Sequence, residues 1–193
     1  MSVSVVVIGT SLGGFCALQV LLAGLPREFR PPIIVVQHRG KSDDAGLARL
    51  LSEMTPLPVL EPNDKDPLEA GCVYLAPADY HLLVERGRFA LSTEGPVNYA
   101  RPSIDVLFES AADAYGAGVI GVVLTGSNND GASGCARIKD RGGIVLVQWA
   151  EEAESAIMPA AAIAATRVDQ ILPLSEISTA LCNLCLDQEV AHG

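Results

Sequence analysis

The features that would place this chain in a membrane or a secretory pathway are missing from its sequence. No apolar run approaches the roughly 18–20 residues needed to cross a bilayer, and the N-terminus lacks the basic segment of a secretory signal. The five cysteines are odd in number and lie mostly in apolar segments, which is typical of reduced thiols. We therefore expect a cytoplasmic protein with no membrane insertion.

Aromatic and basic residues are both scarce. Aromatics make up only 5% of the chain, so the core must consist of Val, Ile, Leu and Ala, the usual filling of a parallel sheet covered by helices. The 13 basic residues are outnumbered by 23 acidic ones, giving a formal charge of −10. This balance argues against nucleic acid as a partner, because phosphate binding needs a basic face. The 193 residues suffice for one domain with its own core.

The sequence contains only part of the ligand set that a zinc site needs. Cys182 and Cys185 form a CxxC pair, but no second pair or nearby histidine completes a metal site. The same spacing places both thiols on one face of a helix, which is the interpretation we favour. We expect no metal.

Short apolar runs typical of buried strands alternate along the chain with segments whose apolar residues recur at helical spacing. Apolar, β-branched runs predict buried strands at residues 3–8, 33–37, 73–76, 119–124, 144–147 and 170–172. Helices are expected at residues 13–22, 45–54, 103–115, 131–139 and 175–186, with an Ala-rich helix around Pro159. Asp43 or Asp44 is the expected cap of the second helix.

Two short strands interrupt this alternation. Residues 81–85 and 88–91 flank Arg86-Gly87, which predicts a hairpin. The predicted fold is α/β: a three-layer, doubly wound, mainly parallel sheet with a small antiparallel hairpin insert. We expect one domain over residues 1–193, with a frayed tail at 187–193.

Three reactive side chains follow three of the predicted core strands. Ser11, His38 and Asp130 come after the strands at 3–8, 33–37 and 119–124, and sites in open parallel sheets lie beyond the carboxyl ends of the strands. A serine nucleophile needs a neighbouring base, histidine exchanges protons near neutral pH, and a buried carboxylate orients the imidazole. The arrangement predicts a Ser-His-Asp hydrolase.

Each residue also has a structural alternative. Ser11 and Asp130 could cap the helices that follow them, and His38 could bond to backbone, with His81 and His192 as competing histidines. Nucleotide binding is disfavoured, because residues 9–14 do not match GxGxxG and the chain contains no GK[ST]. A GxSxG elbow is also absent.

At these residues the sequence resembles the catalytic domain of the chemotaxis protein-glutamate methylesterases, the CheB family. The resemblance covers nearly the whole chain, and no single motif carries it alone. The matching stretches are Val7-Ile8-Gly9-Thr10-Ser11-Leu12-Gly13-Gly14, Val36-Gln37-His38, Gly71-Cys72-Val73-Tyr74-Leu75-Ala76-Pro77 with His81, Pro96-Val97-Asn98 with Arg101-Pro102-Ser103-Ile104-Asp105-Val106-Leu107-Phe108, Gly121-Val122-Val123-Leu124-Thr125-Gly126, Asn129-Asp130-Gly131-Ala132, Met158-Pro159, and Val168-Asp169 with Leu172-Pro173-Leu174.

The resemblance implies a function and a set of site residues. It assigns catalysis to Ser11, His38 and Asp130, and it implies hydrolysis of glutamate γ-methyl esters on the signalling helices of chemoreceptors, with deamidation of glutamines as a related activity. No cofactor is implied. The expected oxyanion and site loops comprise Thr10, Leu12, Gly13, Gly14, Ser127 and Asn128, and the expected substrate rim comprises Arg39 and Arg101.

Several positions depart from the family pattern. Leu12 stands where threonine is common, His38-Arg39-Gly40 replaces His-Met-Pro, and Ser127-Asn128 replaces Met-Gly. These changes keep open two alternatives: a CheB-like scaffold with little or no activity, or an esterase with the same mechanism and another substrate. The chain starts at the catalytic domain's first strand, so we expect no receiver domain in cis. The enzyme is then either unregulated or controlled by a partner acting in trans or through its expression.

Overall fold

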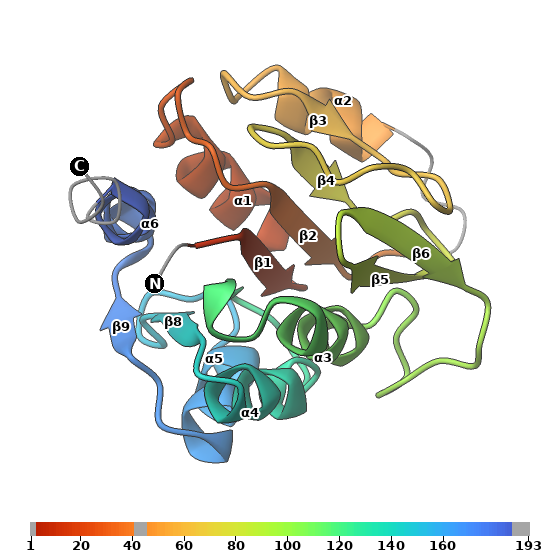
Figure 1. The fold of residues 1–193 in the computed structure, drawn as a ribbon. Helices are drawn as coiled ribbons and strands as arrows, with labels where there is room; N and C mark the ends of the chain where they lie inside the picture. The colour runs from red at the N-terminus through yellow and green to blue at the C-terminus, as the bar shows by residue number, and fades with distance from the viewer. Residues whose placement is uncertain (1–2, 41–45, 187–193) are drawn as a thin grey trace.

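Seven parallel strands form the centre of the molecule. The structure is a computed structural model that describes residues 3–40 and 46–186. The strand order is β3-β4-β2-β1-β7-β8-β9, and every neighbouring pair is parallel (Figure 1). The strands are β1 (Val5–Thr10), β2 (Ile33–Gln37), β3 (Val59–Leu60), β4 (Val73–Leu75), β7 (Val119–Val123), β8 (Ile144–Gln148) and β9 (Gln170–Leu172).

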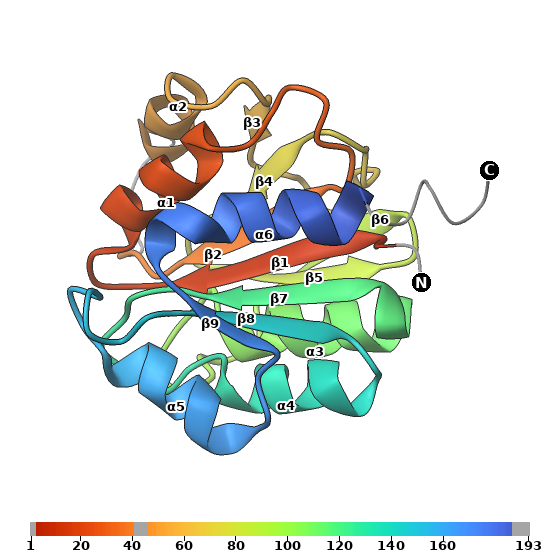
Figure 2. The same ribbon diagram turned by 90° about the vertical axis from the view of Figure 1, so that its left-hand side faces the viewer.

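Helices cover both faces of this sheet, as Figure 2 shows. On one face lie α1 (Gly14–Ala23), α2 (Gly46–Ser52) and α6 (Leu174–Leu186), and on the other lie α3 (Ile104–Tyr115), α4 (Ala132–Asp140) and α5 (Ile157–Ala165). A 3-10 turn, η1 (Gly116–Gly118), joins α3 to β7. Successive residues of β1 serve opposite faces: Val6 and Ile8 pack with the first group, Val5 and Val7 with the second. The predicted three-layer α/β fold is confirmed.

The predicted hairpin insert is also confirmed. Strands β5 (His81–Glu85) and β6 (Arg88–Ser92) pair antiparallel, and Gly87 turns between them with a φ of 76°. Two bonds attach the hairpin to α3: the N–H of Val84 donates to Ser110 Oγ at 3.0 Å, and the N–H of Gly87 to the Tyr115 hydroxyl at 2.8 Å. The hairpin thus extends the layer that contains α3.

The CxxC pair lies on a helix, as its spacing suggested. Cys182 and Cys185 are partly buried on α6 against the core, and burial raises the pKa of both thiols, that of Cys185 to about 12. Within residues 3–40 and 46–186, no group of three potential ligands could hold a metal ion, and no helix is long and apolar enough to span a membrane.

Strand β3 has no counterpart among the predicted strands. It contains two residues between prolines and is defined only by its pairing with β4, so its local sequence has no strand periodicity. The expected cap at Asp43 or Asp44 and the expected frayed tail lie outside the described residues.

Candidate active site

The loops after β1 and β7 diverge at the carboxyl edge of the sheet. The first leads into α1 on one face and the second into α4 on the other, so β1 and β7 border the point where the strand order reverses. Crevices at such points are the usual ligand sites of open α/β sheets. Backbone bonds hold the loops together: the N–H of Ser11 donates to the carbonyl of Thr125, and that of His38 to Thr10, both at 3.0 Å.

His38 and Asp130 form a close pair at this edge. Nε2 of His38 lies 2.8 Å from Oδ2 of Asp130, with the carboxylate fully buried and the imidazole 12% exposed. On the other side of the ring, Nδ2 of Asn128 lies 3.4 Å from Nδ1. Because a carboxylate only accepts and an amide NH₂ only donates, Nε2 carries the proton and Nδ1 presents its lone pair. The neighbours therefore select one neutral tautomer of His38.

Asp130 is fixed by the N-terminus of α3. The N–H groups of Ile104 and Asp105 donate to its carboxylate at 2.7 and 3.1 Å, and the hydroxyl of Ser103 at 2.8 Å. Burial alone would raise the pKa of Asp130, but the hydrogen bonds from His38 and from these N–H groups hold that pKa below its usual value. The carboxylate thus stays charged and points one oxygen at the imidazole.

Asp130 does not cap the helix that follows it. The N-cap of α4 is Gly131, in the left-handed region at φ 98°, and it offers no side chain. The N-terminus of α4 is instead closed by Asp105 of α3, whose Oδ1 accepts from the N–H of Gly134 at 2.7 Å. The N-terminus of α3 therefore receives the carboxylate of Asp130, from the loop before α4, and the N-terminus of α4 receives that of Asp105, from α3. We call this arrangement of Asp105 and Asp130 the carboxylate exchange.

Asn98 bridges the two exchanged carboxylates. Its Nδ2 lies 2.8 Å from Oδ2 of Asp105 and 3.3 Å from Oδ1 of Asp130. Burial raises the pKa of Asp105 to about 6, and the negative charges of Asp130 and Glu109 add to the rise, while the N–H of Gly134 opposes it. The amide thus separates two buried like charges.

Ser11 lies in a loop whose conformation requires glycine at positions 13 and 14. Gly13, at φ 77°, is the N-cap of α1, so Ser11 is not the cap of that helix. A Cβ on Gly14 would overlap the side chains of Gln37 and Thr10. Within the described part of the chain, the Ser11 hydroxyl and the N–H groups of Leu12 and Gly13 make no hydrogen bond. One hydroxyl and two backbone donors are therefore left for a ligand.

The remaining predicted site residues divide into two groups. Leu12 and Ser127 are exposed beside the site, and Asn128 contacts His38. Thr10 is fully buried and donates to the carbonyl of Thr125 at 2.9 Å, so it shapes the loops without facing a substrate.

Both rim arginines are bound within the protein. Nη2 of Arg39 contacts Glu61 Oε1 at 2.6 Å and the carbonyl of Ala76 at 2.7 Å. Arg101 pairs with Asp79 at 2.6 Å and donates to the carbonyls of Thr93 and Glu94 at 2.8 and 2.9 Å. Their guanidinium groups thus stabilise the rim.

A cavity of about 390 Å³ opens beside His38. Arg39, Arg101 and Asn128 line it together with Asn98 and Tyr99. This volume accommodates a short side chain and leaves room for water.

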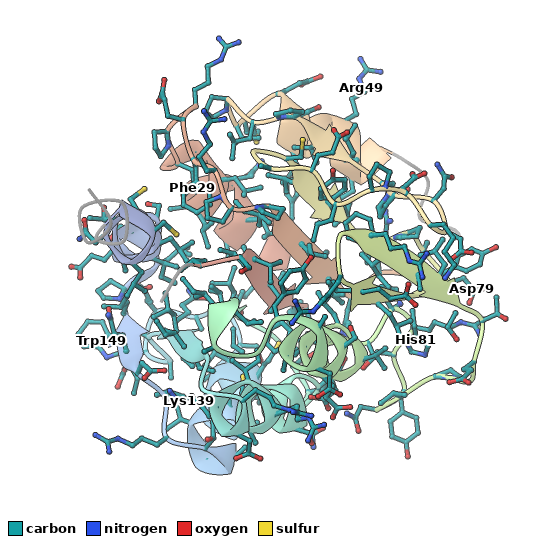
Figure 3. All side chains as sticks on the ribbon, viewed as in Figure 1. Phe29, Arg49, Asp79, His81, Lys139 and Trp149 are labelled. Carbon is teal, nitrogen blue, oxygen red and sulfur yellow. The ribbon has the colours of Figure 1, made fainter. Side chains whose placement is uncertain are left out.

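The other histidines do not enter the site. Nε2 of His81 lies 3.0 Å from the carbonyl of Gly95, and its Nδ1 accepts from the N–H of Ser103 at 3.2 Å, so His81 fastens the segment that leads to α3. Figure 3 shows His81 near Asp79, the partner of Arg101, on the side of the hairpin. His192 lies outside the described residues.

Sequence reasoning missed the supports of Asp130. Ser103 carried a signal, because it precedes a helical segment and caps α3. Asn98 and Asp105 lie in stretches that match the family, but the sequence carried no signal of their contacts with Asp130, which join positions separated by 32 and 25 residues.

The fold and the site define a class: an α/β protein with a histidine–carboxylate pair and a serine at the switch point of a parallel sheet. The model of the CheB methylesterase family matches residues 6–181. The chain belongs to the CheB methylesterase family, a family of hydrolases.

Individual relatives agree with this assignment. A Leptospira interrogans protein, by name a putative protein-glutamate methylesterase/protein-glutamine glutaminase, is 44% identical over 92% of this chain and 93% of its own length. A protein-glutamate methylesterase/protein-glutamine glutaminase from Anaeromyxobacter dehalogenans is 48% identical over 94% of this chain, which spans 53% of that protein. The crystal structure of the Thermotoga maritima CheB methylesterase catalytic domain superposes with a TM-score of 0.90 at 34% identity, covering 95% of this chain and all of that one.

Proposed function

We propose that this chain is a serine hydrolase that removes methyl groups from glutamate γ-methyl esters on chemoreceptor signalling helices. The observation that carries the proposal is the 2.8 Å pair of His38 and a fully buried Asp130, at the sheet edge where Ser11 follows β1. The names of the relatives supply the substrate class. Such receptors present these helices in the cytoplasm, where we place the reaction.

The first half of the reaction forms an acyl-enzyme. Ser11 Oγ attacks the ester carbonyl carbon while its proton passes to Nδ1 of His38, the nitrogen that does not face Asp130. Asn128 must release Nδ1 as the serine engages it. The carboxylate of Asp130 stabilises the imidazolium that forms. In this proposal the N–H groups of Leu12 and Gly13, which follow the nucleophile at the positive end of α1, donate to the developing oxyanion.

The second half returns the enzyme to its starting state. The tetrahedral intermediate collapses, and methanol leaves with the proton that His38 carried. Water then attacks the acyl-enzyme, His38 takes one of its protons, and the free glutamate departs as Ser11 is reprotonated. With a glutamine side chain the same steps release ammonia, which gives the deamidase activity. No step requires a cofactor.

Methanol release from a methylated receptor fragment is the decisive assay. We expect the native chain to release methanol, Ser11→Ala to abolish release with the fold intact, and Asp130→Asn to lower it sharply. Retained activity in Ser11→Ala would overturn the assignment of the nucleophile.

The same preparations separate the alternatives. A serine-directed phosphonate that labels Ser11 while methylated receptor stays inert would indicate an esterase with another substrate. A folded chain that is neither labelled nor active would be a binding scaffold. A regulator acting in trans would reveal itself as a change in the rate of methanol release when the candidate protein is added.

A further inference from the structure

The segment between β6 and α3 carries a turn that its sequence does not favour. Val97 and Ala100 exchange two backbone hydrogen bonds, of 3.1 and 2.9 Å, around Asn98 and Tyr99. Both central residues are left-handed, with φ of 50° and 62°. Such type I′ turns prefer Asn and Gly at these positions. A bulky aromatic residue in this conformation is an outlier.

Interactions within the protein account for the left-handed backbone of Asn98 but not for that of Tyr99. The left-handed backbone of Asn98 aims its amide at Asp105 and Asp130, where it bridges the carboxylates. Tyr99 as a whole residue is 104% exposed, the highest value among the exposed large apolar residues of the described chain. The fold therefore gains neither burial nor a favourable backbone from this tyrosine.

The turn is held in place at both of its flanks. Arg101 binds the carbonyls of Thr93 and Glu94, and His81 bonds to Gly95 and Ser103. The ring of Tyr99 is thus presented from an anchored backbone. A tyrosine has only two side-chain torsions to fix on binding, so an anchored one loses little entropy in a contact.

Tyr99 also lies at the active site. It lines the same cavity of about 390 Å³ as His38. The glutamyl side chain that reacts is small, whereas a fully exposed ring can be covered only by something that extends past the cavity. Strained, exposed residues at the mouth of a site commonly have a role in ligand contact.

We propose that Tyr99 is a substrate-docking residue, which packs against apolar side chains beside the methylated glutamate on a receptor helix. Its role is to hold protein substrates, and it takes no part in bond making. Leu12, 51% exposed next to Ser11, gives a second apolar contact beside the reacting group. The inference rests on the proposed function and names the part of the enzyme that distinguishes a protein ester from a small one.

Replacing Tyr99 should separate stability from activity. Tyr99→Gly removes the left-handed strain, so its melting temperature should equal or exceed that of the native chain. Its kcat/KM for methanol release from a methylated receptor fragment should fall about ten-fold or more, mainly through KM. Turnover of p-nitrophenyl acetate, which has no flanking apolar side chains to pack against the ring, should change less than about two-fold.

Three further variants serve as controls. Tyr99→Ala should behave like Tyr99→Gly towards the receptor fragment, which excludes added loop flexibility as the cause. Tyr99→Phe should keep native activity, because the ring makes the contact. Trp149→Ala removes an exposed aromatic that does not line the cavity and lies on the opposite side from His81 in Figure 3. It should leave both activities unchanged.

The outcomes distinguish this inference from the proposed function. An active native chain with undiminished activity in Tyr99→Ala would overturn the docking role alone. Equal losses on the receptor fragment and on p-nitrophenyl acetate would show that Tyr99 supports the site structurally, which also overturns it. A native chain that hydrolyses p-nitrophenyl acetate but not the methylated fragment would overturn the receptor substrate, and the docking role with it.

Discussion

Replacing Asp105 by asparagine should change how the stability of the protein depends on pH. Asp105 is 4% exposed and belongs to the carboxylate exchange, where burial and the charge of Asp130 raise its pKa from 3.8 to about 6. A carboxyl whose pKa is raised in the folded state favours the fold when protonated. Its contribution to stability is therefore fully present below about pH 4 and is lost as the pH rises through 6.

The size of this effect follows from the pKa. One pKa unit corresponds to about 1.36 kcal/mol, so the rise from 3.8 to about 6 corresponds to about 3 kcal/mol, of which roughly 2 kcal/mol is lost between pH 4.5 and 7.5. Asp130 titrates in the opposite sense: its pKa is lowered, and its contribution is lost only as the pH falls below about 4. The two carboxylates therefore act in separate pH ranges.

The measurement is urea unfolding of the native chain and of Asp105→Asn, followed by circular dichroism at pH 4.5, 5.5, 6.5 and 7.5. Asparagine keeps one oxygen for the N–H of Gly134 but turns an amide NH₂ towards that of Asn98, a cost that does not vary with pH. The variant should gain about 2 kcal/mol relative to the native chain across this range.

A matched control is Glu109→Gln, on the exposed side of the same helix. Glu109 contributes less to the raised pKa of Asp105 than burial or the charge of Asp130 does, so removing it lowers that pKa only slightly. The stability of Glu109→Gln relative to the native chain should therefore vary much less with pH than that of Asp105→Asn. Parallel stability curves for the native chain and Asp105→Asn would refute the reasoning, because Asp105 would then titrate normally in the fold.

Three other substitutions test the site directly. Asp130→Asn should lower kcat about 10⁴-fold with little change in KM, measured as methanol release, since the imidazolium loses its carboxylate. A loss below ten-fold would contradict that role. Ser103→Ala removes both the α3 cap and a donor to Asp130, and urea unfolding should report a loss of about 1–2 kcal/mol; an unchanged midpoint would count against it. Gly14→Ala should lower the melting temperature, at a cost of about 1–3 kcal/mol, because its methyl overlaps Thr10 and Gln37. A native melting temperature would show that the loop adapts.

The sheet and the placement of the candidate site were predictable from the sequence. Buried β-branched runs identify strands on their own, and the rule that sites lie at the carboxyl ends of strands selected Ser11, His38 and Asp130 before any contact was known. The structure brings His38 and Asp130 together. Ser11 follows β1, the strand that pairs with β2, which precedes His38. The catalytic roles of the three residues stay predictions.

The supports of the site were not predictable, for a physical reason. The contacts of Asp130 with the first turn of α3 depend on how two helices dock, and no periodicity in either segment records this. The two rim arginines illustrate the same limit. From the sequence alone, Arg39 and Arg101 were predicted to face the substrate. In the structure, Arg39 pairs with Glu61 and Arg101 with Asp79, each 22 residues away along the chain.

The carboxylate exchange ties the orientation of the His38 imidazole to the completion of folding. Asp130 meets its hydrogen-bond donors only after α3 has docked, and α4 gains its closing carboxylate at the same moment. Under the proposed mechanism, a nascent or partly melted chain lacks an oriented imidazole and should not hydrolyse cellular esters. The helix pair works as an assembly checkpoint: hydrolytic competence should arise in step with amide protection at Ile104 and Gly134 as the chain refolds, and should vanish with that protection on heating.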